Sequence, residues 1–311
     1  MLHTPGEKVM QKPTLTPALT EYSTMLWDYV GACTARGAAS ARTKLAYSAA
    51  IGLYLAWCTA QRVDPRGARR EDIENWRGYM LAAGASAGTV MLRLSAVRTL
   101  YRAMSRAGIR PDNPAEYVKS PRPEISTVDQ VMKRLVAPDQ MVVALAKISA
   151  DYRGRRDRVI LLALYLLGLR VSEAAGLDWA DWGGDTLAFK AKGAQARELA
   201  IPEALKQALA ELQAAAPSTQ GPMFIGEGTR LTVRAVQAMV TVRLAAAGLG
   251  QLSPHALRHS CATAAAIAGS SPYAIQDQLG HASQRTTAIY TRVAGRFLEA
   301  PSMAVARAMG I

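Results

Sequence analysis

The sequence predicts a mainly α-helical protein with a small antiparallel β-sheet, divided into two domains. Three observations lead to this fold class. Apolar residues recur at helical spacing along most of the 311 residues. A segment with four prolines, residues 110–127, interrupts that spacing and is typical of an interdomain linker. Two short runs with β character, residues 186–189 and 199–201, flank a Lys/Gly/Gln turn and predict a hairpin.

The first domain is predicted to contain three helices, at residues 40–62, 70–84 and 86–108. Each of them places apolar side chains on one face. The third helix also carries a row of arginines on another face, and such a row fits a solvated surface and a contact with the DNA backbone equally well. The row consists of Arg98, Arg102 and Arg106.

The second domain is predicted to be built around a continuous apolar stretch within residues 155–177. A helix precedes this stretch at 138–150, and the hairpin follows it. The remaining helices are expected on either side of Tyr290 and at 203–215, 230–247, 255–268 and 272–279.

The charge of the chain indicates a polyanionic partner. The formal net charge is +13 and the isoelectric point is about 9.9. The excess is shared, because residues 1–124 contain 17 Lys/Arg against 10 Asp/Glu, and residues 125–311 contain 20 against 14. Nucleic acid is therefore the first candidate partner, and ordinary solubilising charge is the alternative.

Several classes of protein are disfavoured. The three cysteines, Cys33, Cys58 and Cys261, are widely spaced, which is typical of reduced thiols in a cytosolic protein. The N-terminus lacks the apolar core of a signal peptide. The longest apolar run, residues 159–169, is shorter than the roughly 18 residues that span a bilayer. We expect a cytoplasmic protein without a membrane partner, associated with the nucleoid if its polyanion is DNA.

Three histidines, His255, His259 and His281, lie close together in the sequence. Ser253 and Pro254 begin a predicted helix, so His255 and Arg258 share one face and can serve one site. His255 and His259 could instead form a metal pair with Cys261 nearby, but a third and a fourth ligand are missing, and we predict no metal site. On an isolated helix, His255 and Arg258 would be surface residues.

Other segments add groups with related chemistry. Arg170 follows the long apolar stretch directly, where a charged side chain needs a partner or a ligand, and Glu173 could be that partner. The predicted hairpin carries Lys192 on its turn. The segment "LGHASQRTTAIYTRV" adds His281 and Tyr290.

Together these segments resemble the tyrosine recombinase (phage integrase) family, in its simple Xer-like or Cre-like two-domain form. The family's ordered Arg, Lys, His, Arg, His/Trp and Tyr positions are filled by Arg170, Lys192, His255, Arg258, His281 and Tyr290. The hairpin reads "AKGAQAR" where the family often has GKGxKxR. Lys192 is the natural match to the family's lysine, Lys190 is a less close one, and Arg197 matches the trailing arginine.

The resemblance implies a helical, SAM-like core-binding domain at residues 19–117 and a tyrosine-recombinase catalytic domain at 135–293. A disordered leader at 1–18, a linker at 118–134 and a tail at 294–311 complete the chain. The tail has a short amphipathic pattern that could dock on a neighbouring subunit, pack on its own subunit or be disordered.

The resemblance also implies DNA cleavage and rejoining through a 3′-phosphotyrosine, without a cofactor. Two arginines, Arg170 and Arg258, can neutralise the non-bridging phosphate oxygens. Tyr290 would be the nucleophile, because a phenol is also a good leaving group when the DNA is resealed. By resemblance, Lys192 would protonate the 5′ oxygen, and the two histidines would bind phosphate oxygens, with His255 a candidate acceptor of the tyrosine proton. We interpret Glu173 as a residue that orients its neighbours.

The implied partners are double-stranded DNA and three further copies of the chain, in a tetramer that holds two sites, with an accessory directionality factor as an additional possibility. The outcome could be integration, excision or resolution. The alternatives are a type IB topoisomerase, which shares the covalent step, and a catalytically silent DNA-binding protein. The residues that we expect to contact DNA are Arg93, Arg98, Arg102, Arg230 and Arg234.

Overall fold

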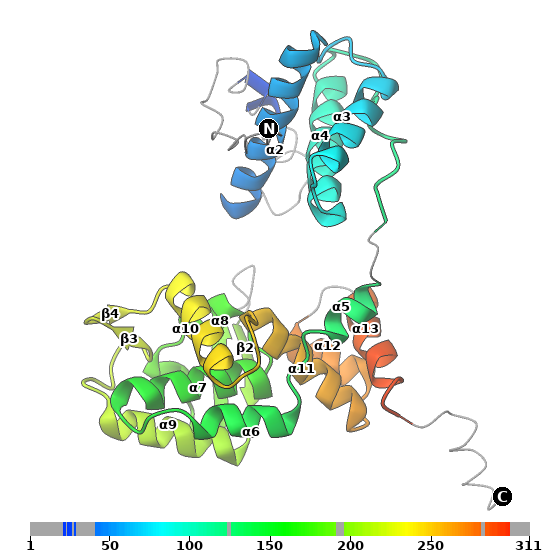
Figure 1. The fold of residues 1–311 in the computed structure, drawn as a ribbon. Helices are drawn as coiled ribbons and strands as arrows, with labels where there is room; N and C mark the ends of the chain where they lie inside the picture. Colours follow the sequence, from blue (N-terminus) through cyan, green and yellow to red (C-terminus); the bar gives the residue numbers. More distant parts are fainter. Residues whose placement is uncertain are drawn as a thin grey trace, which may run out of the picture. The chain divides into compact units, whose positions relative to one another are not determined.

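The computed structural model describes residues 21–22, 24–26, 28, 41–122, 126–190, 196–280 and 284–298. The chain divides into two compact units, Met1–Glu124 and Ile125–Ile311 (Figure 1). Helices dominate the described residues of both units, and the strands described in the second unit form two small antiparallel pairs. The predicted fold class is thereby confirmed.

The first unit contains the helices α2 (Ala41–Gln61), α3 (Arg70–Ala82) and α4 (Ala87–Arg106). They agree with the three predicted helices to within two residues at each end. The Oγ of Ser86 accepts a hydrogen bond from the backbone N–H of Thr89 and so caps α4. The core contains a group of aromatic side chains, in which the hydroxyl groups of Tyr54 and Tyr101 are 2.5 Å apart and the ring of Trp76 meets that of Tyr54 edge-on.

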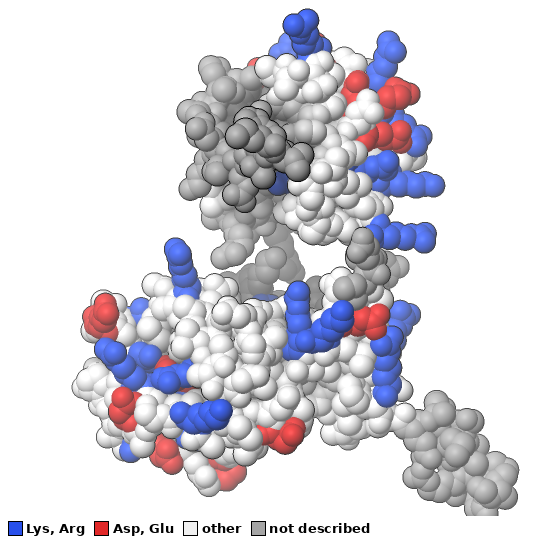
Figure 2. Space-filling view, in the orientation of Figure 1, with Lys and Arg blue, Asp and Glu red and all other residues white. Residues whose placement is uncertain are grey.

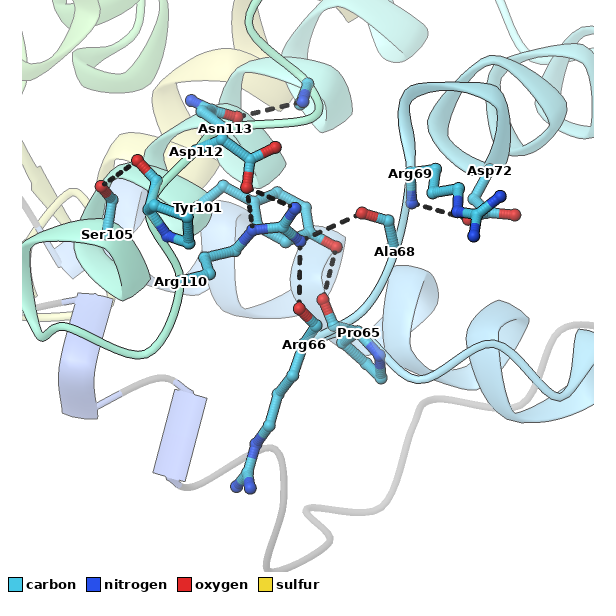
Figure 3. Close-up of polar contacts among 12 residues, drawn as sticks. Pro65, Arg66, Ala68, Arg69, Asp72, Tyr101, Ser105, Arg110, Asp112 and Asn113 are labelled. Carbon is cyan, nitrogen blue, oxygen red and sulfur yellow. Dashed lines mark hydrogen bonds and ion pairs between the residues drawn. The ribbon is translucent and has the colours of Figure 1, made fainter.

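Arg110 fixes the chain that follows α4 to the rest of the first unit (Figure 3). Its guanidinium donates to the carboxylate of Asp112 and to the carbonyl oxygens of Arg66 and Ala68. It also lies over the ring of Tyr101, 5.0 Å from the centroid. The beginning of the proline-rich segment is therefore held against the α2–α3 connection.

The second unit surrounds α7 (Tyr152–Leu166), which is buried along most of its length. This burial explains the continuous apolar sequence, because both α9 and α11 pack on α7. The other helices are α5 (Thr127–Met132), α6 (Pro138–Ala146), α8 (Val171–Ala175), the 3₁₀ turn η1 (Trp179–Asp181), α9 (Glu203–Ala215), α10 (Val233–Ala246), α11 (Pro254–Ile267), α12 (Pro272–Leu279) and α13 (Gln284–Ala294).

The predicted hairpin is confirmed. Strand β1 (Thr186–Lys190) pairs antiparallel with β2 (Ala196–Ala200), with Thr186 opposite Ala200. A second pair, β3 (Ile225–Gly226) and β4 (Thr229–Arg230), was not predicted, because two residues per strand leave no alternation to detect. Arg230 therefore lies in a strand, and α10 begins three residues later than the sequence predicted, where Thr232 caps it.

Helix α5 lies inside the range 118–134 that the sequence assigned to a linker. Ser126 caps it by accepting from the N–H of Asp129, and α5 packs against α13 (Figure 1). The carboxylate of Asp129 pairs with Arg296 at 2.6 Å. This end of the linker range is therefore tied to the second unit. The predicted leader, 1–18, and the tail beyond residue 298 lie outside the described residues.

Within the described part of the chain, no helix combines the length and the apolar character that crossing a membrane requires. Cys58 and Cys261 are free thiols buried in the two units.

Candidate active site

Arg170 is positioned by Glu173 in the first turn of α8. The carboxylate of Glu173 accepts from the backbone N–H of Arg170 at 2.7 Å and from its Nη1 at 2.6 Å. The second guanidinium nitrogen donates to the carbonyl oxygen of Gly280 at 3.0 Å. One buried carboxylate thus fixes both the backbone and the side chain of Arg170, as the sequence suggested it could.

Arg258 projects from the second turn of α11 and is 3% exposed. Its Nη2 donates to the carbonyl oxygen of Leu279 at 2.5 Å, and its Nη1 donates to that of Gly168. Burial, together with the nearby charge of Arg170, lowers the pKa of Arg258 to about 10. The group still carries its charge at neutral pH.

The C-terminal end of α12 is where the arginines of the site converge. The carbonyl oxygens of residues 277–280 accept hydrogen bonds from Arg197, Arg258 and Arg170. The end of a helix carries partial negative charge, which stabilises these cations. Gly280 closes the helix in the left-handed conformation, with φ +63°, and a Cβ there would lie 2.5 Å from Arg197 Nη1.

Tyr290 lies in α13 and is 1% exposed. Its ring packs with Ala262, Ala266, Ile275 and Leu279. Its hydroxyl group is 2.9 Å from Nδ1 of His259. Burial raises the pKa of Tyr290 above its ordinary value, and the opposing effect of the Arg258 charge is smaller.

His255 lies one turn before His259, and their ring centroids are 4.2 Å apart. Its side chain reaches solvent. Partial desolvation of the ring, followed by the positive charges of Arg258, Arg170 and Arg134, lowers the pKa of His255. The described residues contain no cluster of three or more metal-binding side chains, so the His255–His259 pair has no third ligand among them.

Lys192 and His281 lie outside the described residues. Their neighbours in sequence are described: Lys192 falls between the ends of β1 and β2, and His281 follows Gly280 directly. Arg197 in β2 lies over the ring of Phe189, 5.5 Å from the centroid, and donates to the end of α12. This arginine therefore ties the hairpin to the segment that leads to His281.

The arginines expected to contact DNA differ in their contacts within the chain. Arg98 donates to the carbonyl oxygens of Ala115 and Val118, Arg102 pairs with Glu116, and Arg230 pairs with Asp178. No hydrogen bond or ion pair of Arg93 or Arg234 is found among the described residues. Figure 2 shows Lys and Arg side chains along one side of the first unit, with acidic side chains among them.

The sequence does not predict the contact that places His259 in the site. Its spacing from His255 indicates only a possible metal pair. The contact with Tyr290 joins residues 31 positions apart. A sequence signal does exist, since position 259 lies one turn from His255 on a helix that also carries Arg258.

Comparison with known proteins identifies the family of this chain. Residues 134–296 match the model of the phage integrase family, and residues 29–108 match the N-terminal SAM-like domain of phage integrases. The chain is 36% identical over 239 residues to the tyrosine recombinase XerC of Methylobacterium sp. (strain 4-46), covering 71% of this chain and 72% of that protein. It is 33% identical over 220 residues to the tyrosine recombinase XerD of Neisseria meningitidis, covering 66% and 72%.

Solved structures share the fold. The Tn1549 transposon integrase in complex with circular intermediate DNA superposes with a TM-score of 0.70 at 17% identity, covering 93% of this chain and 98% of that one. The recombinase XerH bound to its difH substrate superposes with a TM-score of 0.63 at 17% identity, covering 88% and 92%. The chain therefore belongs to the phage integrase family of tyrosine-type site-specific DNA recombinases.

Proposed function

We propose that this recombinase cleaves and rejoins DNA through a 3′-phosphotyrosine on Tyr290, and exchanges strands between two sites. The observation that carries the proposal is the convergence of Arg170 and Arg258 at the C-terminal end of α12. These two cations come from separate segments and are held by the protein before any DNA is bound. A preorganised pair of cations is what a developing pentacoordinate phosphate requires.

In the proposed reaction, Arg170 and Arg258 bind the non-bridging oxygens of the target phosphate. Planar guanidinium groups can bind such oxygens in a bidentate manner, which an ammonium group cannot do. The Tyr290 oxygen attacks phosphorus and forms the covalent intermediate. His255 and His281 hydrogen-bond the phosphate oxygens as the negative charge on them develops.

Lys192 acts as the general acid on the 5′ oxygen, which is a poor leaving group without a proton. On the return step the same lysine takes the proton of the attacking 5′ hydroxyl group. The attachment of Arg197 to α12 supports this role, because it fixes the base of the hairpin near the carbonyl oxygens that hold the two catalytic arginines.

We propose that four copies assemble on two sites and exchange strands pairwise, with the C-terminal tail contributing to contacts between subunits. Integration, excision and resolution all use this chemistry. An accessory directionality factor would select among them.

Covalent capture from the genomic DNA of the source organism tests the nucleophile and requires no defined target sequence. The protein is incubated with sheared DNA, denatured in detergent, and recovered with any attached strand for sequencing. We expect adducts with the wild type, joined through a 3′ phosphate and leaving a free 5′ hydroxyl group, and none with Tyr290→Phe. Tyr273→Phe is the matched control, because Tyr273 lies on α12 and is 70% exposed.

Other outcomes contradict the proposal. Adducts that persist in Tyr290→Phe identify another nucleophile. DNA binding without any adduct indicates a silent DNA-binding protein. The recovered sequence is then placed twice on a supercoiled plasmid. Recombinant products support strand exchange, whereas relaxation alone indicates a topoisomerase.

A further inference from the structure

One polar contact of Tyr290 has no role in the reaction described above. Nδ1 of His259 lies 2.9 Å from the hydroxyl oxygen of Tyr290, and the two ring centroids are 5.6 Å apart. His259 is not one of the six residues that fill the family's positions. The contact joins α11 to α13, so the packing of these two helices creates it.

The surroundings of Tyr290 create a need for a proton acceptor. The ring is 1% exposed, and burial raises the pKa of the phenol. The hydroxyl group therefore keeps its proton at neutral pH. A protonated phenol is a weak nucleophile, so the proton must pass to a base as the oxygen attacks phosphorus.

His259 lies where such a base is needed. It is adjacent in sequence to Arg258, which contacts the end of α12, and its ring touches that of His255 one turn earlier. The acceptor for the nucleophile and one of the phosphate-binding arginines are thus fixed by the same helix. A neutral imidazole whose proton is on Nε2 presents Nδ1 as an acceptor to the phenol.

We propose that His259 is the base that accepts the proton of Tyr290 during cleavage, an assignment that rests on the proposed phosphotyrosine chemistry. The Tyr290 oxygen forms its bond to phosphorus, and its proton moves to Nδ1 of His259. The bond between phosphorus and the 5′ oxygen breaks, and that oxygen takes a proton from Lys192. Rejoining reverses each transfer, so that Tyr290 departs with the proton held by His259.

Two substitutions separate proton transfer from positioning. His259→Asn places an amide oxygen near the position of Nδ1, where it accepts a hydrogen bond but does not take a proton. His259→Ala removes both functions. The substrate is a nicked suicide duplex of the site recovered by covalent capture. We expect both His259→Asn and His259→Ala to form the adduct more slowly by a factor of roughly 100 or more, with DNA binding retained.

Thr263→Val is the matched control. Thr263 is buried one turn further along α11, and its hydroxyl group has no hydrogen-bond partner among the described residues. We expect wild-type cleavage from this variant. Thermal unfolding of all the variants verifies that they are folded.

The outcomes distinguish a failure of proton transfer by His259 from a failure of the proposed phosphotyrosine chemistry. Wild-type cleavage by His259→Asn shows that hydrogen bonding alone is needed, and overturns proton transfer. Faster cleavage by His259→Ala shows that the contact restrains Tyr290 instead. If the wild type forms no adduct, the proposed function fails and this assignment fails with it.

A substrate with a changed leaving group shows whether His259 deprotonates Tyr290 or protonates the leaving 5′ oxygen. Replacing the bridging 5′ oxygen by sulfur gives a leaving group that needs no proton. We expect this substrate to restore cleavage by Lys192→Ala and to leave both His259 variants slow. Restoration of the His259 variants would assign His259 to the leaving group and overturn the proposal.

The hydrogen bond itself is measured without DNA. ¹⁵N NMR of the histidine rings in the full chain reports which nitrogen carries the proton. We expect the Nε2–H tautomer for His259, and an Nδ1 resonance that shifts in Tyr290→Phe. An Nδ1–H tautomer in the wild type would make His259 a donor to Tyr290 and would overturn the assignment.

Discussion

Arg170 and Arg258 donate their hydrogen bonds to different kinds of acceptor, and this gives them different roles at the phosphate. Arg170 shares its charge with the carboxylate of Glu173. Arg258 donates to neutral carbonyl oxygens, those of Gly168 and Leu279. A neutral carbonyl group orients a guanidinium, whereas a carboxylate also neutralises its charge. Arg258 therefore attracts an anion more strongly than Arg170 does. We infer that Arg258 supplies most of the attraction for the phosphate, while the Glu173 pair fixes the angle of Arg170.

His255 is predicted to titrate below the usual range of histidine. Desolvation, Arg258, Arg170 and Arg134 all lower its pKa. The unfolded chain therefore binds a proton on His255 at a higher pH than the folded chain, with an ordinary value of about 6.5. The contribution of the neutral His255 ring to the free energy of unfolding is fully present above that value. This contribution is lost as the pH decreases from about 6.5 through the folded-state pKa.

NMR titration of the His255 ring protons measures this shift directly. Arg134→Gln should move the midpoint back towards the ordinary value, because it removes one of the positive charges. Lys206→Gln is the control, since this lysine pairs with Asp185 and does not contribute to the His255 shift. A wild-type midpoint above about 6.5 would contradict the electrostatic description of the site.

At the scale of elements, the C-terminal end of α12 holds together arginines from three other elements. It receives Arg197 from the hairpin, Arg258 from α11 and Arg170 from α8. Gly280 permits this by its left-handed backbone and by the absence of a Cβ. Residue 280 also precedes His281 directly. A change at this glycine therefore acts on several proposed catalytic groups together.

Gly280→Ala is expected to slow cleavage and to destabilise the second unit. The positive φ alone costs about 1–2 kcal/mol in an alanine. The added Cβ would also displace Arg197, whose Nη1 lies 2.5 Å from its position. Gly269→Ala separates the two effects, because Gly269 has φ +87° and nothing within 4 Å of a Cβ.

Urea unfolding and suicide-duplex cleavage measure the two consequences. We expect both variants to lose stability and only Gly280→Ala to lose cleavage beyond the loss of folded protein. Equal cleavage by the two variants would show that the position of Arg197 has no influence on the reaction.

The sequence predicts the elements better than the contacts between them. Periodicity located α9 and α12 to the residue, because both are amphipathic and bounded by proline. It missed β3–β4 and α5, which are too short to show a period. The order of the site residues pointed to the family. The shared end of α12 could not be predicted, because its acceptors are backbone carbonyl oxygens, which any residue type provides.

At the scale of the whole molecule, the two units each have a hydrophobic core and a positive charge. Buried aliphatic and aromatic residues form the core of the first unit, and the residues around α7 form that of the second. A unit with its own core can fold by itself. Basic residues exceed acidic ones in both units. We therefore predict that residues 1–124 and 125–311, expressed separately, each fold and each bind DNA.

Salt dependence of binding to one duplex tests whether both units contact the phosphate backbone. Binding that neutralises phosphates releases counterions, so the logarithm of affinity falls with the logarithm of salt concentration in proportion to the number of contacts. We expect each fragment to show a shallower slope than the intact chain, with the two fragment slopes adding up to about the intact slope. An equimolar mixture should still bind more weakly than the intact chain, because only the covalent linkage makes the second binding event intramolecular. A single fragment with the slope and affinity of the intact chain would show that one unit alone contacts the duplex.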